Sequence, residues 1–209
     1  MRNSLLALVG ATLFLAGCGA DAPKETAVVK VPDVFAVKFE TTKGDFTIEA
    51  HRDWAPFGVD RFHELVRAKY FDDARFFRVL KGFIVQFGIN KEPAVSAKWR
   101  DMRLPDDPVK QKNTRGMVTY AKGGPNTRTT QLFINTVDNA DKLDSMGFAP
   151  FGLVVDGMKV VDALYGGYGE SSSQGGAGPD QQLIQARGNQ YLDEHYPKLD
   201  SIKTARILQ

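Results

Sequence analysis

Apolar and polar residues alternate along residues 34–42 and 45–50, and Lys43-Gly44 separates the two stretches. An alternation with a period of two is typical of a half-buried β-strand, and a short break containing glycine predicts a hairpin turn. The apolar face of this hairpin would hold Phe35, Val37, Phe39, Phe46 and Ile48. The pattern therefore predicts an antiparallel hairpin with one buried face.

The period changes to that of a helix over residues 55–68, where a proline suits the first turn. The apolar residues that recur at helical spacing in this stretch are Val59, Phe62, Leu65 and Val66. A short amphipathic helix is predicted around residues 160–164. A longer helical segment is predicted over 180–195, weakened by Gly188.

Further apolar runs predict the remaining strands. Residues 76–88 read as two strands joined by a turn at Leu80-Lys81-Gly82. The other strands are predicted at 117–121, 131–136, 148–155 and 202–208. Together with the first hairpin, this makes about eight strands and two or three helices. The count favours a mostly β fold, a closed antiparallel eight-stranded β-barrel capped by helices.

Three segments without a clear apolar period are predicted to be loops. Residues 89–115 form a long polar connection, which we expect Trp99 and Leu104 to pin down. Residues 122–130 hold glycine, proline, asparagine and threonine, and glycine allows the backbone to approach a ligand closely. Residues 166–179 hold six glycines and three serines, and we expect this segment to be mobile.

The composition excludes several classes of protein. The chain has 209 residues, which suits one domain, and 43% of them are hydrophobic, too few for a polytopic membrane protein. The formal net charge is +2 and the basic residues are scattered, so we expect no nucleic-acid partner. His51, His63 and His195 stand apart from one another, so we expect no metal and no cofactor. No coiled-coil pattern indicates an oligomer, and a monomer is the default expectation.

The N-terminus has the pattern of a targeting segment. A basic start precedes an apolar run at residues 5–15, which is too short for an ordinary spanning helix. The run ends in Leu15-Ala16-Gly17-Cys18, which resembles the lipobox of bacterial lipoproteins. The resemblance implies that residues 1–17 are a signal peptide and that Cys18 is acylated. The alternative is a plain secretory signal that happens to contain a cysteine.

Residues 18–33 then read as the acylated cysteine and a flexible tether, because they are polar, contain two prolines and show no apolar period. The tether would hold a domain at residues 34–209 close to a membrane. Gly19, where an aspartate would favour retention in the inner membrane, indicates the outer membrane if the cell is Gram-negative. We therefore expect a lipid-anchored protein of the cell envelope, on the periplasmic side.

One arginine and one glutamine interrupt the apolar residues of 76–88. Arg78 and Gln86 are both even-numbered, so strands that pair in phase across the turn would place them on one face, together with Ile84. Arginine is a fixed cation with five hydrogen-bond donors and no acceptor. Beside the apolar Phe83, an arginine suits a ligand that is largely apolar but carries a carbonyl group.

Three blocks of sequence carry a family resemblance. The first is residues 76–88, and the second is residues 116–135, which include Gly124-Pro125-Asn126-Thr127 and Gln131-Leu132-Phe133-Ile134. The third is Leu143-Asp144 followed by Phe151-Gly152. In this order the blocks resemble the cyclophilins, the peptidyl-prolyl cis-trans isomerases. The resemblance covers about residues 35–208 and implies a barrel that accelerates rotation of X–Pro bonds in proline-containing polypeptides.

The resemblance also implies a role for each residue that matches the family's motifs. Arg78 would donate a hydrogen bond to the twisted peptide bond, and Gln86 would orient Arg78 or the peptide backbone. The residues that would bind the substrate are Phe83, Ile84, Lys122, Gln131, Phe133, Leu143 and Phe148. Lys122 stands where the family has an asparagine, so we expect its main chain to do the binding.

Three positions depart from the family's pattern and put the substrate preference in doubt. Phe77 replaces a histidine, Lys142 replaces a tryptophan of the pocket rim, and Phe148 replaces a pocket histidine. They leave two main hypotheses open. One is an anchored isomerase that assists the folding of exported proteins. The other is a chaperone or assembly lipoprotein that binds proline segments with little turnover, and a third, weaker option is a structural spacer in the envelope.

Overall fold

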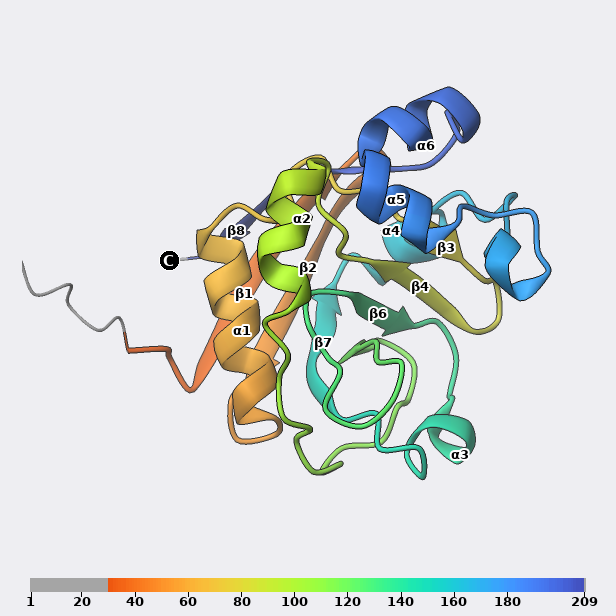
Figure 1. Cartoon of the computed structure of the whole chain (residues 1–209). Helices are drawn as coiled ribbons and strands as arrows, with labels where there is room; N and C mark the ends of the chain where they lie inside the picture. The colour runs from red at the N-terminus through yellow and green to blue at the C-terminus, as the bar shows by residue number, and fades with distance from the viewer. Residues whose placement is uncertain (1–29, 209) are drawn as a thin grey trace, which may run out of the picture. The chain divides into compact units, whose positions relative to one another are not determined.

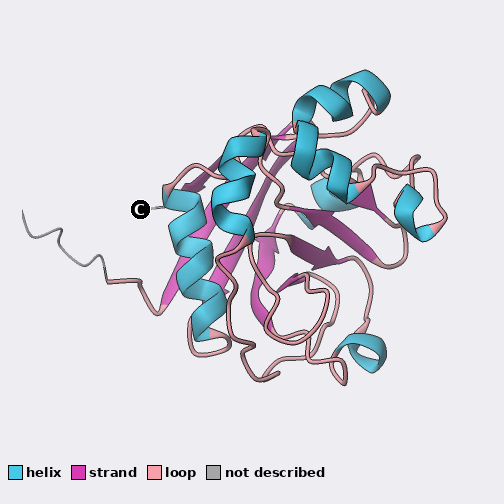
Figure 2. Cartoon of the chain, in the orientation of Figure 1, coloured by secondary structure: helices cyan, strands magenta, loops and turns pink. Residues whose placement is uncertain are grey.

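The computed structural model describes residues 30–208, which contain eight strands in one sheet and helices packed around it (Figures 1 and 2). The strands are β1 (Val34–Thr41), β2 (Gly44–His51), β3 (Arg78–Val79), β4 (Ile84–Phe87), β5 (Met117–Tyr120), β6 (Leu132–Asn135), β7 (Pro150–Asp156) and β8 (Ile202–Ile207). The helices are α1 (Pro56–Arg67), α2 (Pro93–Arg100), α3 (Ala140–Leu143), α4 (Met158–Asp162), α5 (Gln181–Arg187) and α6 (Asn189–His195), with a 3₁₀ turn, η1 (Ser172–Gln174). The expected signal peptide, Cys18 and the tether up to residue 29 lie outside the described residues.

The sheet is antiparallel, with the strand order β3-β4-β6-β5-β7-β2-β1-β8. Among the described strands β3 and β8 are therefore its edges, and the expected closed barrel is wrong: the sheet is curled but open. The reason lies in β3, which has two residues and ends before a ladder with β8 can form. The chain just before β3 still reaches β8, because Phe76 N donates to Asp200 O at 3.0 Å and Ile202 N donates to Ala74 O at 2.9 Å.

The first hairpin and the first helix form the centre of the core, as their periods predicted. In the β1–β2 register Val37 faces Ile48 and Phe39 faces Phe46, and the rings of the latter pair stack with centroids 4.9 Å apart. Helix α1 covers these strands (Figure 1) and inserts Phe62, whose ring stacks on Phe39 at 6.3 Å. All five of these side chains are fully buried. The aromatic content of the chain is concentrated here, which makes this face a closed core.

Helix α2 lies where the sequence predicted a loop. Its first residue, Pro93, lacks an N–H that a helix would leave unpaired in any case. Only Val95 and Trp99 of its residues pack against the core, too few apolar positions to show a helical period. Trp99 nevertheless pins the segment as expected, with its ring 5.9 Å from that of Tyr70 and under the guanidinium of Arg61 at 5.1 Å. The helix α3 was not predicted either, because its 4 residues are too few to show a helical period.

Helices α5 and α6 replace the single longer helix that was predicted. The break falls at Gly188, which has a φ of +59° and runs so close to Lys91 that an added Cβ would overlap its carbonyl oxygen. A residue with a side chain would be excluded from this position. Asp180 starts α5, because its side chain accepts hydrogen bonds from the first backbone N–H groups. The two helices cover a second apolar cluster, which consists of Phe77, Ile89, Ile184, Tyr191 and Leu192.

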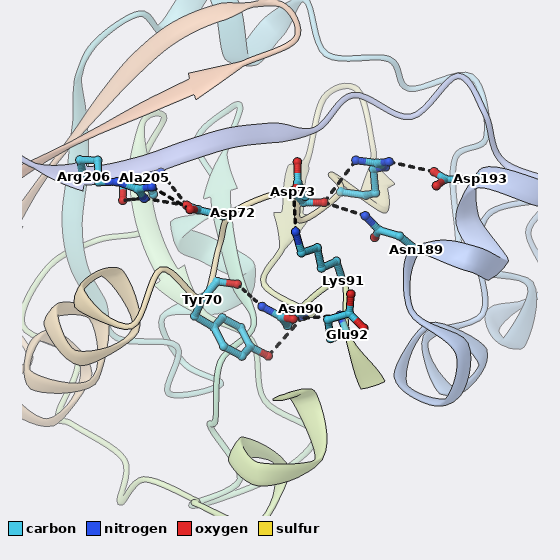
Figure 3. Close-up of polar contacts among 11 residues, drawn as sticks. Tyr70, Asp72, Asp73, Asn90, Lys91, Glu92, Asn189, Asp193, Ala205 and Arg206 are labelled. Atoms are coloured by element: carbon cyan, nitrogen blue, oxygen red, sulfur yellow. Dashed lines mark hydrogen bonds and ion pairs between the residues drawn. The ribbon is translucent and has the colours of Figure 1, made fainter. Parts of the chain in front are cut away.

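Polar contacts add to this attachment of α6 (Figure 3). Lys91 Nζ lies 2.6 Å from Asp73 Oδ2, and Asn189 Nδ2 donates to the carbonyl oxygen of Asp73 at 3.0 Å. Arg75, just before β3, pairs with Asp193 of α6 at 2.8 Å. Exposed pairs of this kind contribute about 0–1 kcal/mol each, so the apolar cluster beneath the helices is the stronger term.

None of the helices between residues 30 and 208 has the length and apolar character that crossing a bilayer requires. Within the same residues, His, Cys, Asp and Glu form no group that could hold a metal ion.

Candidate active site

A cavity of about 760 Å³ opens between β4, β6 and the loops that follow β5 and α3. Its walls include all nine residues that the sequence predicted for the substrate site: Arg78, Phe83, Ile84, Gln86, Lys122, Gln131, Phe133, Leu143 and Phe148. These residues span 71 positions of the chain (148 − 78 + 1), and the fold brings them to one cleft. Their roles stay predictions, but their common location is a finding.

Strand register explains why the central side chains share a face. Arg78 lies directly opposite Gln86 in the β3–β4 pair, and Gln86 lies directly opposite Phe133 in the β4–β6 pair. Residues that face each other across an antiparallel pair point to the same side of the sheet. Ile84 joins them because it is two residues from Gln86. The predicted phase of the hairpin is confirmed.

A chain of hydrogen bonds orders the polar side of the cleft. Arg78 Nη1 donates to Gln86 Oε1 at 3.0 Å, and Gln86 Nε2 donates to Gln131 Oε1 at 2.8 Å. Only 5% of Gln86 is exposed, so its amide is held by these two partners rather than by bulk solvent. The arrangement fixes the amide of Gln86 with its oxygen toward Arg78, and the side chain acts as a relay between Arg78 and Gln131.

The apolar side of the cleft is a small cluster separate from the main core. Ile84, Phe133 and Leu143 are almost fully buried, and Phe83, Ala121 and Phe148 pack against them half-buried. The rings of Phe133 and Phe148 meet edge to face with centroids 5.7 Å apart. This geometry is favourable for two aromatic rings. The cluster offers an apolar socket without a hydrogen-bond donor of its own, beside the guanidinium of Arg78.

Glu170 is the polar neighbour that the sequence did not reveal. Its carboxylate takes two hydrogen bonds from Arg78, Nε to Oε1 and Nη2 to Oε2, both at 2.6 Å. The hydrogen bond from Arg78 holds the pKa of Glu170 below its ordinary value, against the effect of burial and with help from the backbone N–H of Ser171. Glu170 stands 92 residues after Arg78 in a segment of glycine and serine, so neither spacing nor period could have indicated the pair.

The segment that carries Glu170 was expected to be mobile, yet it is folded back on itself. Ser171 is 1% exposed, its hydroxyl donates to the carbonyl oxygen of Pro179 at 2.9 Å, and Ser172 N donates to Gly178 O at 2.9 Å. Its glycines allow this return, because a Cβ at Gly176 or Gly178 would overlap the carbonyl oxygen of Glu170. Although its composition is of low complexity, this segment forms a tight loop.

Lys122 forms the opposite rim of the cleft. Its Nζ pairs with Asp106 Oδ2 at 3.2 Å and lies 5.4 Å from the ring centroid of Phe148. Burial acts to raise the pKa of Asp106, but hydrogen bonds from the backbone of Asn126 and from Lys122 outweigh it and lower the pKa. The side chain of Lys122 is thus occupied within the protein. Binding of a ligand by its main chain stays a prediction from the sequence.

The departures from the family's pattern have structural explanations at two positions. Phe77 is 2% exposed and points away from the cleft into the cluster beneath α5 and α6, where an imidazole would bury polar nitrogens. Lys142 lines the cavity, with its Nζ 5.9 Å from the ring centroid of Phe83. A flexible cationic side chain therefore stands where the family has a flat tryptophan ring at the pocket rim.

Comparison with known proteins assigns the chain to a class. Residues 36–185 match the family model described as cyclophilin type peptidyl-prolyl cis-trans isomerase/CLD. The chain belongs to this family and is an isomerase of the cyclophilin type.

Relatives agree with the assignment. The chain is 36% identical over 143 residues to peptidyl-prolyl cis-trans isomerase B of Escherichia coli, an alignment covering 62% of this chain and 84% of that protein. It is 33% identical over 143 residues to peptidyl-prolyl cis-trans isomerase of Acinetobacter baylyi, with 61% of this chain and 70% of that protein covered. The crystal structure of a Cryptosporidium parvum cyclophilin type peptidyl-prolyl cis-trans isomerase shares the fold, with a TM-score of 0.61, 22% identity, and coverage of 84% and 98% of the two chains.

Proposed function

We propose that Arg78 performs the isomerisation by donating hydrogen bonds to an X–Pro peptide bond as it twists. The planar amide resists rotation with a barrier of about 18–20 kcal/mol. Twisting turns the prolyl nitrogen into a pyramidal acceptor, so a donor aimed at that nitrogen stabilises the twisted state and not the planar ones. The reaction then needs no nucleophile, no acid or base and no metal.

One observation carries this proposal: a guanidinium in a fixed plane lines the same cavity as an apolar socket. Arg78 has five N–H donors, of which two go to Glu170 and one to Gln86. Two N–H groups, one on each terminal nitrogen, remain for a ligand. Two is the number that the prolyl nitrogen and the preceding carbonyl require.

The remaining residues of the cleft would hold the substrate in register. Phe133, Ile84 and Leu143 would take the proline ring, which brings an apolar surface and no donor. The side chain of Gln131 and the main chain of Lys122 would bind the extended peptide on either side. Burying a proline ring in such a socket contributes about 1.5–3 kcal/mol to the free energy of binding. This is enough to position the peptide bond but too little to slow product release.

The decisive experiment replaces Arg78 by alanine and measures isomerisation of a proline tetrapeptide in a protease-coupled assay. Removal of one donor aimed at a developing charge typically costs about 2.7–4 kcal/mol, so kcat/KM is expected to fall about 10²–10³-fold. Arg187→Ala is a matched control, because Arg187 is an exposed arginine of α5 that pairs with Glu194. Equal rates for Arg78→Ala and wild type would exclude Arg78 as the source of catalysis.

The alternative, binding of proline segments with little turnover, is favoured by one observation. The carboxylate of Glu170 neutralises the charge of Arg78 and weakens it as a donor. Peptide affinity measured by calorimetry, beside turnover measured by NMR exchange at saturating peptide, separates the two functions. Tight binding with no acceleration of exchange in the wild type would support the alternative.

We further propose that the protein is a lipid-anchored monomer of the cell envelope that acts on exported polypeptides. The support is the sequence alone: a basic start, a short apolar run and Leu15-Ala16-Gly17 before Cys18, which is the single cysteine of the chain. Removal of residues 1–17 and acylation of Cys18 would tether the domain to the membrane. Stable anchoring requires more than one acyl chain, as on a bacterial lipoprotein.

Cys18→Ala tests the anchor in the full chain. The wild type is expected in the membrane fraction and to incorporate labelled palmitate, whereas the variant should appear in the soluble fraction without label. Label on the wild type that persists in Cys18→Ala would contradict the proposed site. Isomerase activity in the soluble fraction should be the same per molecule, because the anchor precedes the described domain.

A further inference from the structure

We propose that Glu170 is a positioning residue for Arg78: its carboxylate sets the plane in which the guanidinium meets the substrate. The inference rests on the proposed role of Arg78. The two hydrogen bonds of 2.6 Å from Nε and Nη2 form a side-on bidentate fork, and a bidentate pair restricts the orientation of an arginine as well as stabilising its charge. Gln86 completes the frame with a third bond to Nη1.

The fold holds Glu170 in place for this task. The backbone N–H of Ser171 donates to Glu170 Oε1 at 2.7 Å, so the carboxylate is itself oriented. The N–H of Gly178 donates to the carbonyl oxygen of Glu170 at 2.6 Å, and the hydroxyl of Ser171 ties the loop to Pro179. The side chain of Glu170 is 29% exposed, yet hydrogen bonds hold both its carboxylate and its backbone carbonyl. A loop of six glycines is thereby fixed around one carboxylate.

The donor count distinguishes positioning from obstruction. An obstructing carboxylate would occupy the N–H groups that the substrate needs. Glu170 instead takes Nε and one side of Nη2, which leaves one N–H on each terminal nitrogen. The side chain of Arg78 is 14% exposed, and without Glu170 its only recorded partner among the described residues would be Gln86. An arginine with one partner samples several rotamers, and each departure from the productive plane removes a donor from the prolyl nitrogen.

The same segment widens the role of the C-terminal part of the chain. Gln174 of η1 and Gln181 of α5 line the cavity, so residues after Glu170 also face the ligand. The matched family region ends at residue 185, just after this contact. The loop therefore belongs to the working cleft through Glu170 and is more than a connection between α4 and α5.

The test is a double-mutant cycle in the full chain, with kcat and KM measured separately on a proline tetrapeptide. Glu170→Ala should lower kcat about 10-fold with little change in KM, since charge-assisted hydrogen bonds are lost but the apolar socket is intact. Glu170→Gln keeps the shape and one acceptor, and should fall between Glu170→Ala and the wild type. Glu194→Ala removes an exposed carboxylate from another arginine pair and serves as the control, with rates expected to equal those of the wild type.

The Arg78→Ala background provides the readout that a merely structural role would not move. There Glu170→Ala should cause no further loss of kcat, because its effect runs through the missing guanidinium. An equal fold-loss in both backgrounds would overturn the inference, as would unchanged or increased kcat in Glu170→Ala alone. Full activity of Arg78→Ala would instead defeat the proposed role of Arg78, so the two failures are distinguishable.

Discussion

Strands β4 and β6 have two faces that use similar residues for opposite purposes. One face points to the main core, where Val85, Phe87, Leu132 and Ile134 are buried. The other face, with Ile84, Gln86 and Phe133, borders the cavity of about 760 Å³. Phe87 and Phe133 are nearly equal in burial, at 0% and 3% exposed. Burial alone therefore does not tell a core ring from a ring of the binding site.

The difference lies in what stands beside each ring. Phe87 meets Phe39, Phe71 and Phe76, with centroids 5.4–5.9 Å apart. Among the described rings, Phe133 meets that of Phe148, and it packs with the aliphatic Ile84 and Leu143 where the cluster borders the cavity. The ring of Phe87 is enclosed by other rings of the main core, whereas one side of the ring of Phe133 borders the cavity. This is the side on which we propose that the proline ring of a substrate binds.

The largest expected effect is on the closed face. Phe87→Ala should lower the free energy of unfolding by about 3–5 kcal/mol, because it leaves a cavity among rings that cannot collapse around it. Urea denaturation measures the change. The kcat of the molecules that remain folded should stay at the wild-type value. A large loss of kcat at full stability would show that the two faces are not independent.

On the open face, Phe133→Ala should have a smaller effect on stability and a larger one on substrate. The truncated site opens into the cleft rather than enclosing a void, so the loss is expected to be about 1–2 kcal/mol. Loss of the socket wall should reduce kcat/KM about 10-fold or more, mostly through KM. If Phe133→Ala destabilised the fold as much as Phe87→Ala, the proposed division between the faces would be wrong.

The smallest effect concerns one of the four arginine–carboxylate forks of the described residues, the pair of Asp72 and Arg206. Asp72 accepts hydrogen bonds from both terminal nitrogens of Arg206 at 2.7 Å at the β8 edge (Figure 3), whereas Glu170 in the cleft accepts from Nε and one terminal nitrogen of Arg78. Burial acts to raise the pKa of Asp72, but the hydrogen bond and charge of Arg206 outweigh it and lower the pKa below its ordinary 3.8. A lowered pKa stabilises the fold at pH values above the unfolded pKa, and the gain is lost as the pH falls through the folded value.

Asp72→Asn should therefore reduce stability at pH 7 by no more than about 1 kcal/mol, since the pair is partly exposed. The difference from wild type should shrink below pH 3.8 and vanish once the carboxyl is protonated in the folded state. Thermal unfolding of both proteins from pH 7 down to pH 2 measures this. A difference that is constant over the whole range would mean that Asp72 stabilises the edge through shape and not through charge.

Elements with a strong period could be predicted from the sequence. The β1–β2 hairpin, α1 and the phase of Arg78 with Gln86 all follow from alternation or helical spacing over several residues. Helix α2 could not be predicted, because Val95 and Trp99 alone carry its apolar face. The open edge at β3 depends on a strand of two residues, and no pattern can be read from so short a run.

The cleft was predicted in part for a related reason. Its apolar wall and the Arg78–Gln86 pair come from strands, where position along the chain determines the face. Glu170 comes from a loop whose course depends on close returns at Gly176 and Gly178. Such a course is determined by backbone contacts within the loop that follow no period, and the composition indicated only that the loop is rich in glycine.

The adjacency of Phe77 and Arg78 has a consequence for how this chain can change. The two residues are neighbours, yet one side chain seals the seam under α5 and α6 while the other stands in the cleft. Deleting one residue from the turn at 80–82 would shift the register of the hairpin by one. The side chain of Phe77 would then point into the cleft, and that of Arg78 into the apolar cluster under α5 and α6. Loss or gain of residues there should therefore be tolerated only in pairs. A point substitution of the exposed Lys81 should have little effect, whereas Gly82, with a φ of +74°, should resist replacement.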